Sequence, residues 1–261
     1  MRPSADRRRE RRPRYTLRRR GRLAATLVIL TVVSVGLLGF APRLPALAGW
    51  YVGAPFRWMV EAVALHWPWA PPVVKVPPIA CTTDKDGDGL PDLDDFVQGA
   101  RQEAGRHTIY RDGYYNGGYP PEGVGVCTDV VWRAFKNAGF DLKSMVDKDI
   151  SVALAAYPRV AGKPEPNIDF RRVPNLVSFF ERNAAKLTAE VIPGNVDNLA
   201  QWQRGDIVIF GNKMEHIGII SDRRRRDGVP FIIHNAGPFA AEEDRLLSLP
   251  WPVTGHYRFP K

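Results

Sequence analysis

The chain has 261 residues, enough for one sizeable domain with appendages, and its net charge is +9. Residues 1–22 hold eleven arginines against Asp6 and Glu10, so this short segment accounts for the whole net charge. Residues 23–261 are neutral overall. A broad basic face for a phosphate backbone is therefore not expected, and nucleic acid is excluded as the expected partner.

An uncharged apolar segment, residues 23–41, follows the basic tail. A run of about twenty apolar residues spans a bilayer as a helix, and the arginines before it favour an N-terminus in the cytoplasm. We therefore predict a single-pass anchor in a bacterial cytoplasmic membrane, with the following domain outside it. The alternative is a signal peptide cleaved near Ala48, because Ala46-Leu47-Ala48 resembles a small-residue cleavage site.

Residues 42–80 are rich in tryptophan and proline and are predicted to form a juxtamembrane linker. The globular domain is expected at 81–261. Its two cysteines, Cys81 and Cys127, would lie in an oxidising compartment, so a disulfide between them is one possibility.

An acidic segment at residues 84–95 has the spacing of an EF-hand-type calcium loop. Oxygen ligands fall at loop positions 1, 3, 5, 7, 9 and 12, with Gly89 at position 6 for the sharp turn. The expected ligands are Asp84, Asp86, Asp88, the Leu90 carbonyl, Asp92 and Asp95. We expect a structural calcium ion here. The alternative is a solvated acidic turn before a helix, where aspartate is favoured by the helix dipole.

The remaining pattern predicts helices first and strands later. Helices are expected at residues 92–105, from Cys127 onward, at 142–156 and at 174–187. Short β-branched or aromatic segments at 206–210, 216–220, 230–234 and 255–259 predict antiparallel strands. This order indicates an α+β domain.

Cys127 follows the glycine-rich turn at residues 120–125 and begins an apolar helical stripe. At a helix N-terminus the unpaired N–H groups and the dipole favour a thiolate, so a lowered thiol pKa and a nucleophilic role are expected. The alternatives are a small buried residue or half of a disulfide.

A nucleophilic cysteine needs a base, and the base needs an orienting group. His216 begins one predicted strand and His234 ends the next, so antiparallel pairing would bring the two rings together. We expect His216 to be the base and His234, or else Asn235, to orient it.

Several segments resemble known cysteine amidases. Gly125–Asp129, Gly205–Val208, His216–Ile220 and Ile233–Asn235 resemble the NlpC/P60 and CHAP branch of the papain-like enzymes. The segments at 126–129, 167–175 and 254–258 resemble the bacterial DUF1287 family more closely, over residues 84–260.

This resemblance implies a papain-like domain of helices packed on a small antiparallel sheet, and a Cys127–His216–His234 site that hydrolyses amide bonds in cell-wall peptidoglycan. A tyrosine before the cysteine often assists the oxyanion in such enzymes, which points to Tyr115, with Tyr114 and Tyr119 as competitors. The other oxyanion or substrate candidates are Asp129, Asp169, Arg171, Asn235 and His256. Asp129 could instead pair with Arg171 or Arg172, or serve only as a helix N-terminal charge, and Asp169 and Arg171 could form a structural ion pair.

Two other functions fit the same residues. The domain could be a non-catalytic cell-envelope binding module on this fold. Alternatively, Cys127, His216 and His234 could bind zinc, which accepts such ligands, although no CxxC or HExxH spacing supports that.

Overall fold

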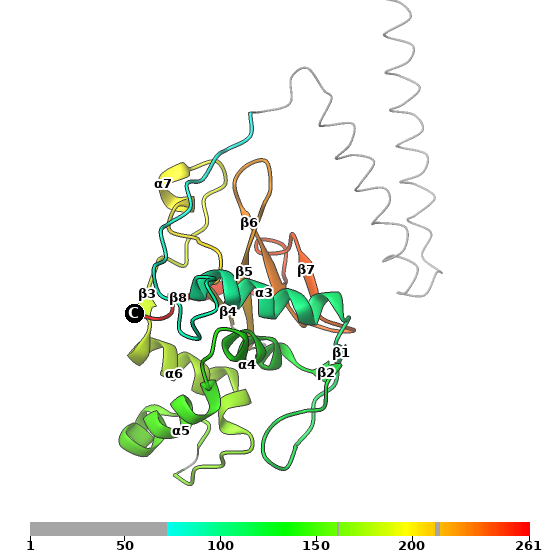
Figure 1. Cartoon of the computed structure of the whole chain (residues 1–261), viewed down its shortest axis with the longest axis vertical. Coiled ribbons are helices and arrows are strands. Elements are labelled where there is room, and N and C mark those ends of the chain that lie inside the picture. The colour runs from blue at the N-terminus through cyan, green and yellow to red at the C-terminus, as the bar shows by residue number, and fades with distance from the viewer. Residues whose placement is uncertain (1–71, 161, 212–214) are drawn as a thin grey trace, which may run out of the picture. The chain divides into compact units, whose positions relative to one another are not determined.

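The structure is a computed structural model that describes residues 72–160, 162–211 and 215–261. Within them the chain forms an α+β unit in which helices pack against a six-stranded antiparallel sheet (Figure 1). The predicted anchor at 23–41, the cleavage site near Ala48 and most of the linker lie outside the described residues. In the part of the chain that is described, no helix is long and apolar enough to cross a membrane.

Two helices, α3 (Asp92–Gly105) and α4 (Cys127–Asn137), form the centre of the helical layer. The acidic first turn of α3 suits the positive end of its dipole. The helices approach closely at Gly99, where an added Cβ would come within 2.9 Å of the Ala134 Cα. This close contact fixes the position of α4, and therefore of Cys127 at its first residue.

The other helical elements lie between α4 and β4 in sequence, with strand β3 between α6 and α7. They are α5 (Leu142–Ala153), η1 (Leu154–Ala156), η2 (Asp169–Arg171), α6 (Val173–Asn183) and the short α7 (Val196–Leu199). Asp141 caps α5 by accepting a hydrogen bond from the Ser144 N–H at 3.1 Å. The helix predicted at 174–187 ends at Asn183, because residues 185–186 join the sheet instead.

The sheet has the strand order β3-β8-β4-β5-β6-β7. Its strands are β3 (Ala185–Lys186), β4 (Ile207–Phe210), β5 (His216–Arg224), β6 (Pro230–His234), β7 (Ala241–Glu243) and β8 (Val253–Arg258). The four predicted strands are present, and the two edge strands were not predicted. A separate parallel pair joins β1 (Ile109–Tyr110) to β2 (Val124–Gly125).

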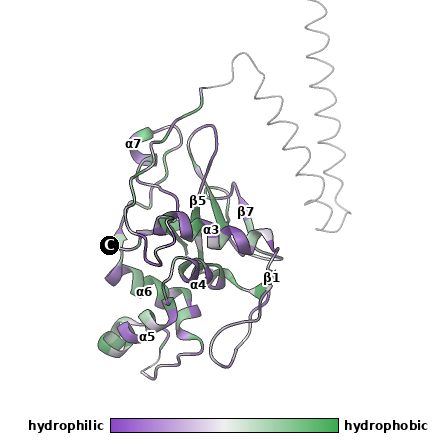
Figure 2. Ribbon diagram, viewed as in Figure 1, coloured by the Kyte–Doolittle hydropathy of each residue, from purple (hydrophilic) through white to green (hydrophobic). Residues whose placement is uncertain are grey.

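Both faces of the sheet are buried. Ile207 and Ile209 of β4 point into a core shared with α3, α4 and α6, whereas Val208 and Phe210 point into a second, smaller core on the opposite face. Successive residues of a strand point to opposite faces of the sheet, and here the residues on both faces are apolar. The central strands are accordingly largely hydrophobic in Figure 2. The sheet therefore separates two environments.

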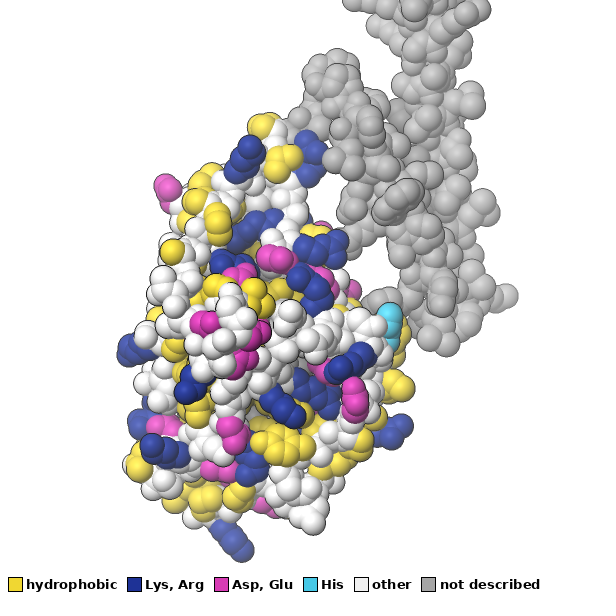
Figure 3. All heavy atoms as spheres, viewed as in Figure 1, with side chains coloured by type: hydrophobic (Ala, Val, Ile, Leu, Met, Phe, Trp, Pro, Cys, Tyr) yellow, Lys and Arg dark blue, Asp and Glu magenta, His cyan; other side chains and the backbone are white. Residues whose placement is uncertain are grey.

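The end of the predicted linker packs on the domain. Val74 and Val76 contact the second core, and the Val74 N–H donates to the Arg226 carbonyl at 2.8 Å. The Ile79 N–H donates to Oε1 of Gln203 at 3.2 Å. Residues 72–80 therefore belong structurally with the domain. On the face shown in Figure 3, basic and acidic side chains are interspersed, as expected for a neutral domain.

Candidate active site

Cys127 is the first residue of α4 and is 7% exposed. The Val126 N–H that precedes it donates to Oδ2 of Asp129 at 2.7 Å, which closes the first turn of the helix. Both Cys127 and Cys81 are free thiols, so the structure does not contain the disulfide between them. The predicted helix start at Cys127 is confirmed.

The expectation of an acidic thiol is wrong for this structure. Burial, the largest effect, raises the thiol pKa of Cys127 to about 12, and the nearby Asp129 charge raises it further. The backbone N–H groups of Ile217, Thr128 and Cys127 act in the opposite direction but do not compensate. The amide dipoles at the helix start are present as predicted, but the loss of hydration outweighs them.

The contact with the Ile217 N–H also locates the sulfur. Ile217 is the second residue of β5, so the thiol lies beside the beginning of this strand, one residue from His216. Helix α4 and strand β5 thus meet at Cys127 and Ile217, which share the first core, next to the residue that the sequence selected as base.

His216 and His234 form a hydrogen bond, as the strand pairing predicted. Nε2 of His216 lies 2.7 Å from Nδ1 of His234, and Nε2 of His234 lies 3.1 Å from Oε1 of Glu243. Glu243 was missed by the sequence reasoning because it lies on β7, a three-residue edge strand with no recognisable pattern. Its carboxylate accepts hydrogen bonds only, so it fixes the direction of the whole chain.

The carboxylate of Glu243 determines which nitrogen of each histidine carries the proton. Glu243 accepts from Nε2–H of His234, which leaves Nδ1 of His234 as an acceptor. That nitrogen then accepts from Nε2–H of His216, which leaves Nδ1 of His216 without a proton. The network therefore presents His216 as a neutral imidazole with Nδ1 available as a base.

The imidazole of His216 is 3% exposed and packs against the rings of Phe210 and Trp251. Burial, with the neighbouring charges of His234 and Arg245, lowers its pKa to about 3. Its contacts belong to the second core, whereas Cys127 packs in the first. Among the described residues, no hydrogen bond joins the sulfur to either histidine, so the thiol and the His216 imidazole are neutral and are not paired with each other in this state.

Asp129 and Arg171 form a buried bidentate ion pair, with Nε–Oδ1 and Nη2–Oδ2 distances of 2.7 and 2.9 Å. Oδ1 of Asp129 also accepts from Nε1 of Trp132 at 2.8 Å, and Nη1 of Arg171 donates to the Gly113 carbonyl. The Arg171 guanidinium lies 5.1 Å from the centroid of the Tyr115 ring. These contacts use the polar atoms of both charged groups, so the expected pairing of Asp129 with Arg171 is present and Asp129 is not a lone helix charge.

Asp169 does not pair with Arg171. It is buried and binds Nη1 of Arg172 at 3.0 Å and the Glu165 N–H at 2.6 Å. His256 is also buried, on β8, where its nitrogens bind the Thr188 carbonyl at 2.8 Å and Oδ2 of Asp206 at 2.9 Å. The structure therefore gives Asp169 and His256 internal partners and brings neither into hydrogen-bond contact with Cys127 or His216.

Asn235 lies on the Cys127 side of the sheet. Its Nδ2 donates to the carbonyls of Gly125 and Thr108 at 3.1 and 3.0 Å. It therefore holds the turn that leads into Cys127, while His234 is the residue in contact with His216.

Tyr110 is a further residue at the site that the sequence reasoning missed. It pairs in register with Gly125, two residues before the cysteine, and its pKa is raised by burial and by the nearby Cys127. It is 44% exposed, so its ring also faces solvent. The two-residue strand that positions it left no signal in a loop rich in tyrosine and glycine.

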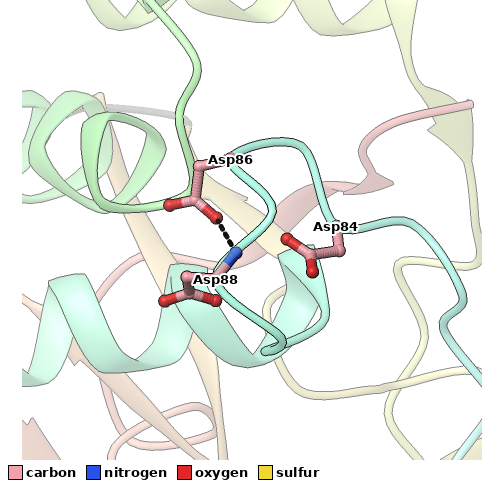
Figure 4. Close-up of side chains that lie close together, drawn as sticks. All are labelled: Asp84, Asp86 and Asp88. Carbon is pink, nitrogen blue, oxygen red and sulfur yellow. Dashed lines mark hydrogen bonds between the residues drawn. The ribbon is translucent and has the colours of Figure 1, made fainter.

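The acidic loop is the one group of metal-ligating side chains that the described residues bring within ligand spacing. Carboxylate oxygens of Asp84, Asp86 and Asp88 all lie within 4.8 Å of one another (Figure 4). In the same residues, Cys127, His216 and His234 do not form such a group. Hence the ligand atoms considered for zinc are not assembled.

Comparison with known proteins gives two matches. Residues 97–259 match a family model described as "Domain of unknown function (DUF1287)". The chain is also 40% identical over 172 residues to an Escherichia coli (strain K12) protein described as "Uncharacterized protein YijF", which covers 63% of this chain and 80% of that protein. No solved structure matches.

Proposed function

The chain belongs to the DUF1287 family, and we propose that it is a cysteine hydrolase that cleaves amide bonds in the cell envelope. One observation carries the proposal: the Ile217 N–H contacts the Cys127 sulfur, which places the thiol one residue from a histidine whose ring is oriented by His234 and Glu243. A thiol, a base and an orienting group are the three parts that nucleophilic catalysis requires.

The proposed reaction starts from neutral partners and requires a rearrangement at the start of β5, because the His216 ring packs on the second core whereas Cys127 packs in the first. Once substrate binding brings the ring to the sulfur, Nδ1 of His216 accepts the thiol proton and the sulfur attacks the amide carbonyl carbon. The Cys127 N–H and the Tyr110 hydroxyl, which takes the place expected for Tyr115, donate to the oxyanion. Protonated His216 gives its proton to the leaving amine, and the C–N bond breaks. His216 then deprotonates a water molecule, which releases the acyl group and regenerates the thiol.

His234 and Glu243 act through His216. Their hydrogen bonds keep the proton of His216 on Nε2 and so keep Nδ1 free for the thiol. They also stabilise the positive charge that His216 acquires when it takes the thiol proton. This is why the pKa of about 3 in the resting state does not prevent base catalysis, since substrate and thiolate change the environment of the ring.

The location and substrate class rest on the sequence. The resemblance to NlpC/P60 enzymes supports a papain-like fold and a peptide substrate in peptidoglycan. The basic tail and the apolar segment at 23–41 support an anchor in the cytoplasmic membrane with the domain outside, or secretion after cleavage near Ala48. In either case the domain would lie outside the cytoplasmic membrane, where the stem peptides of peptidoglycan offer amide bonds.

Digestion of purified peptidoglycan tests the proposal. The full-length chain, purified in a mild detergent, should release new amine ends that mass spectrometry identifies. Cys127→Ala should release none, whereas Cys81→Ser, which removes the other free thiol, should match the wild type. Product release by Cys127→Ala at the wild-type rate would refute a cysteine mechanism.

A binding module is the second candidate, and the lack of a hydrogen bond between the neutral Cys127 thiol and the neutral His216 imidazole favours it. A surface groove of about 640 Å³ beside α4 and α5 offers aromatic and basic side chains for a polymer, among them Tyr119, Trp132, Lys136 and Lys143. In this case the wild type and Cys127→Ala would sediment equally with insoluble peptidoglycan, and neither would release products.

A further inference from the structure

We propose that residues 84–95 bind a calcium ion that joins the start of α3 to the turn after α4. The starting point is the cluster of Asp84, Asp86 and Asp88, three exposed carboxylates drawn together in Figure 4. Like charges at this spacing repel one another. A cation between them would remove this repulsion.

A fourth carboxylate, Asp95, closes the loop from the first turn of α3. Its side chain is buried, 1% exposed, and Oδ1 accepts from Nδ2 of Asn137 at 3.2 Å. Its second oxygen, Oδ2, has no hydrogen-bond partner in the described part of the chain. The negative charges of Asp88, Asp86 and Asp84 act on this carboxylate, which lies outside the group of three whose oxygens come within 4.8 Å of one another. A buried carboxylate oxygen without a partner, at the end of a loop that carries three more carboxylates, is unfavourable unless a cation neutralises it.

The loop backbone holds the carboxylates of Asp84 and Asp88 in place. The two oxygens of Asp84 accept from the N–H groups of Gly87 and Gly89 at 2.8 and 2.9 Å, and Oδ1 of Asp88 accepts from the Leu90 N–H at 2.8 Å. Gly89 has a φ of +94°, a conformation that side chains disfavour, so a glycine suits this turn.

The chemistry of the ligand set selects the ion. Every donor is an oxygen, from the carboxylates, the Leu90 carbonyl and Asp92, and six to eight such ligands match calcium. Magnesium requires a compact octahedron and keeps several waters, and zinc favours nitrogen and sulfur. The set therefore favours calcium over both.

The location shows what the ion would hold together. Gly139, the residue that reverses the chain after α4, lies against Asp86, where an added Cβ would be 2.8 Å from the Asp86 Cβ. Asp94, within the loop, pairs through Oδ2 with Nη2 of Arg204 at 2.7 Å. The ion would thus stabilise the packing of the loop on the end of α4 opposite Cys127. The proposal is independent of any hydrolase activity.

Calcium binding to the full-length chain, purified in a mild detergent with EGTA and then dialysed, tests this proposal. Titration calorimetry should show one site, and calcium at about 100 times its Kd should raise Tm by roughly 5–10 °C. Magnesium at the same concentration should do much less. Asp88→Asn should weaken calcium binding at least tenfold, and Asp197→Asn, an exposed aspartate in α7, should bind like the wild type. If about 5 mM calcium, a concentration that saturates even weak extracellular sites, gives neither heat nor a Tm shift, the proposal is overturned.

Asp95→Asn gives a second test, because this substitution should raise Tm without calcium and reduce the rise in Tm that calcium causes. In EGTA this variant should melt above the wild type, because it removes a buried unpaired charge. In calcium its Tm shift should be smaller than that of the wild type, because it removes a ligand. A variant that melts lower in EGTA and keeps the full calcium shift would show that Asp95 is not part of the site.

Discussion

Nε2 of His216 lies 2.7 Å from Nδ1 of His234, and together with the contact between His234 and Glu243 it assigns the protons of the network. Nε2–H of His216 donates its hydrogen bond to His234, so Nδ1, the ring nitrogen nearest the main chain, carries no proton and is the free base. Nδ1 is therefore the nitrogen that accepts the Cys127 proton in the proposed reaction. Three predictions concern the Cys127–His216–His234–Glu243 site, and a fourth concerns the ion pair behind Cys127.

The first concerns Glu243. Replacing Glu243 with Gln keeps an acceptor but removes the charge that stabilises protonated His216, so we expect a roughly tenfold loss of hydrolysis rate, and Glu243→Leu should lose more. The matched control is Glu190→Gln, an exposed glutamate remote from the histidines in sequence. Rates of peptidoglycan digestion measure the effect, and wild-type activity in Glu243→Leu would contradict the relay.

The second concerns the reactivity of the thiol. Because burial raises the pKa of Cys127 to about 12, iodoacetamide should label it slowly at pH 7 and progressively faster up to pH 10. Measuring Cys81→Ser removes the background from the other thiol. A rate that is already at its plateau near pH 7 would instead reveal a thiolate–imidazolium pair, and would show that the structure describes a state other than the reactive one.

The third concerns acid stability. The pKa of His216 is lowered in the folded state to about 3 from 6.5, so only the unfolded chain takes up this proton between those values. This contribution to stability is therefore complete only well above pH 6.5 and falls as the pH drops, by about 2.3 kcal/mol between pH 6.5 and 4.5. His216→Gln should lack this component.

Urea unfolding of the wild type and His216→Gln at several pH values measures it. Asp95 acts in the opposite direction, because its raised pKa of about 6 makes the folded state take up a proton more readily. The difference between the two proteins isolates His216, and equal pH dependence of the two would contradict the buried neutral imidazole.

The fourth concerns the ion pair behind Cys127. Arg171→Met leaves Asp129 buried without its partner and should lower the free energy of unfolding by about 3–5 kcal/mol. Arg159→Met, which breaks the exposed pair with Glu215 at 3.2 Å, should cost less than about 1 kcal/mol. Chemical denaturation measures both, and equal small losses would mean that the Asp129 pair contributes little.

The sequence predicted the elements with strong patterns and failed on the short ones. The Cys127 helix start, the four main strands and the His216–His234 contact follow from periodicity and strand pairing. The strands β1, β3 and β7 have two or three residues each, too few for a pattern, and they carry Tyr110 and Glu243.

The direction of the Cys127 pKa shift failed for another reason. A helix dipole can be inferred from the sequence, but the amount of water excluded around one sulfur depends on packing of distant segments such as β5. The same applies to Asp169, whose partner is Arg172 instead of Arg171, because which arginine turns inward depends on the backbone of η2.

The packing of Val74 and Val76 on the second core limits how far the domain can extend from a membrane anchor. If residues 23–41 are anchored in the bilayer, only residues 42–71 are left to span the distance to the body of the protein. Fully extended, that tether measures about 100 Å at most. The protein would then act on polymer close to the membrane surface. A protease that cut after residue 80 would release the domain and would also remove Val74 and Val76 from the second core, exposing apolar side chains of the sheet.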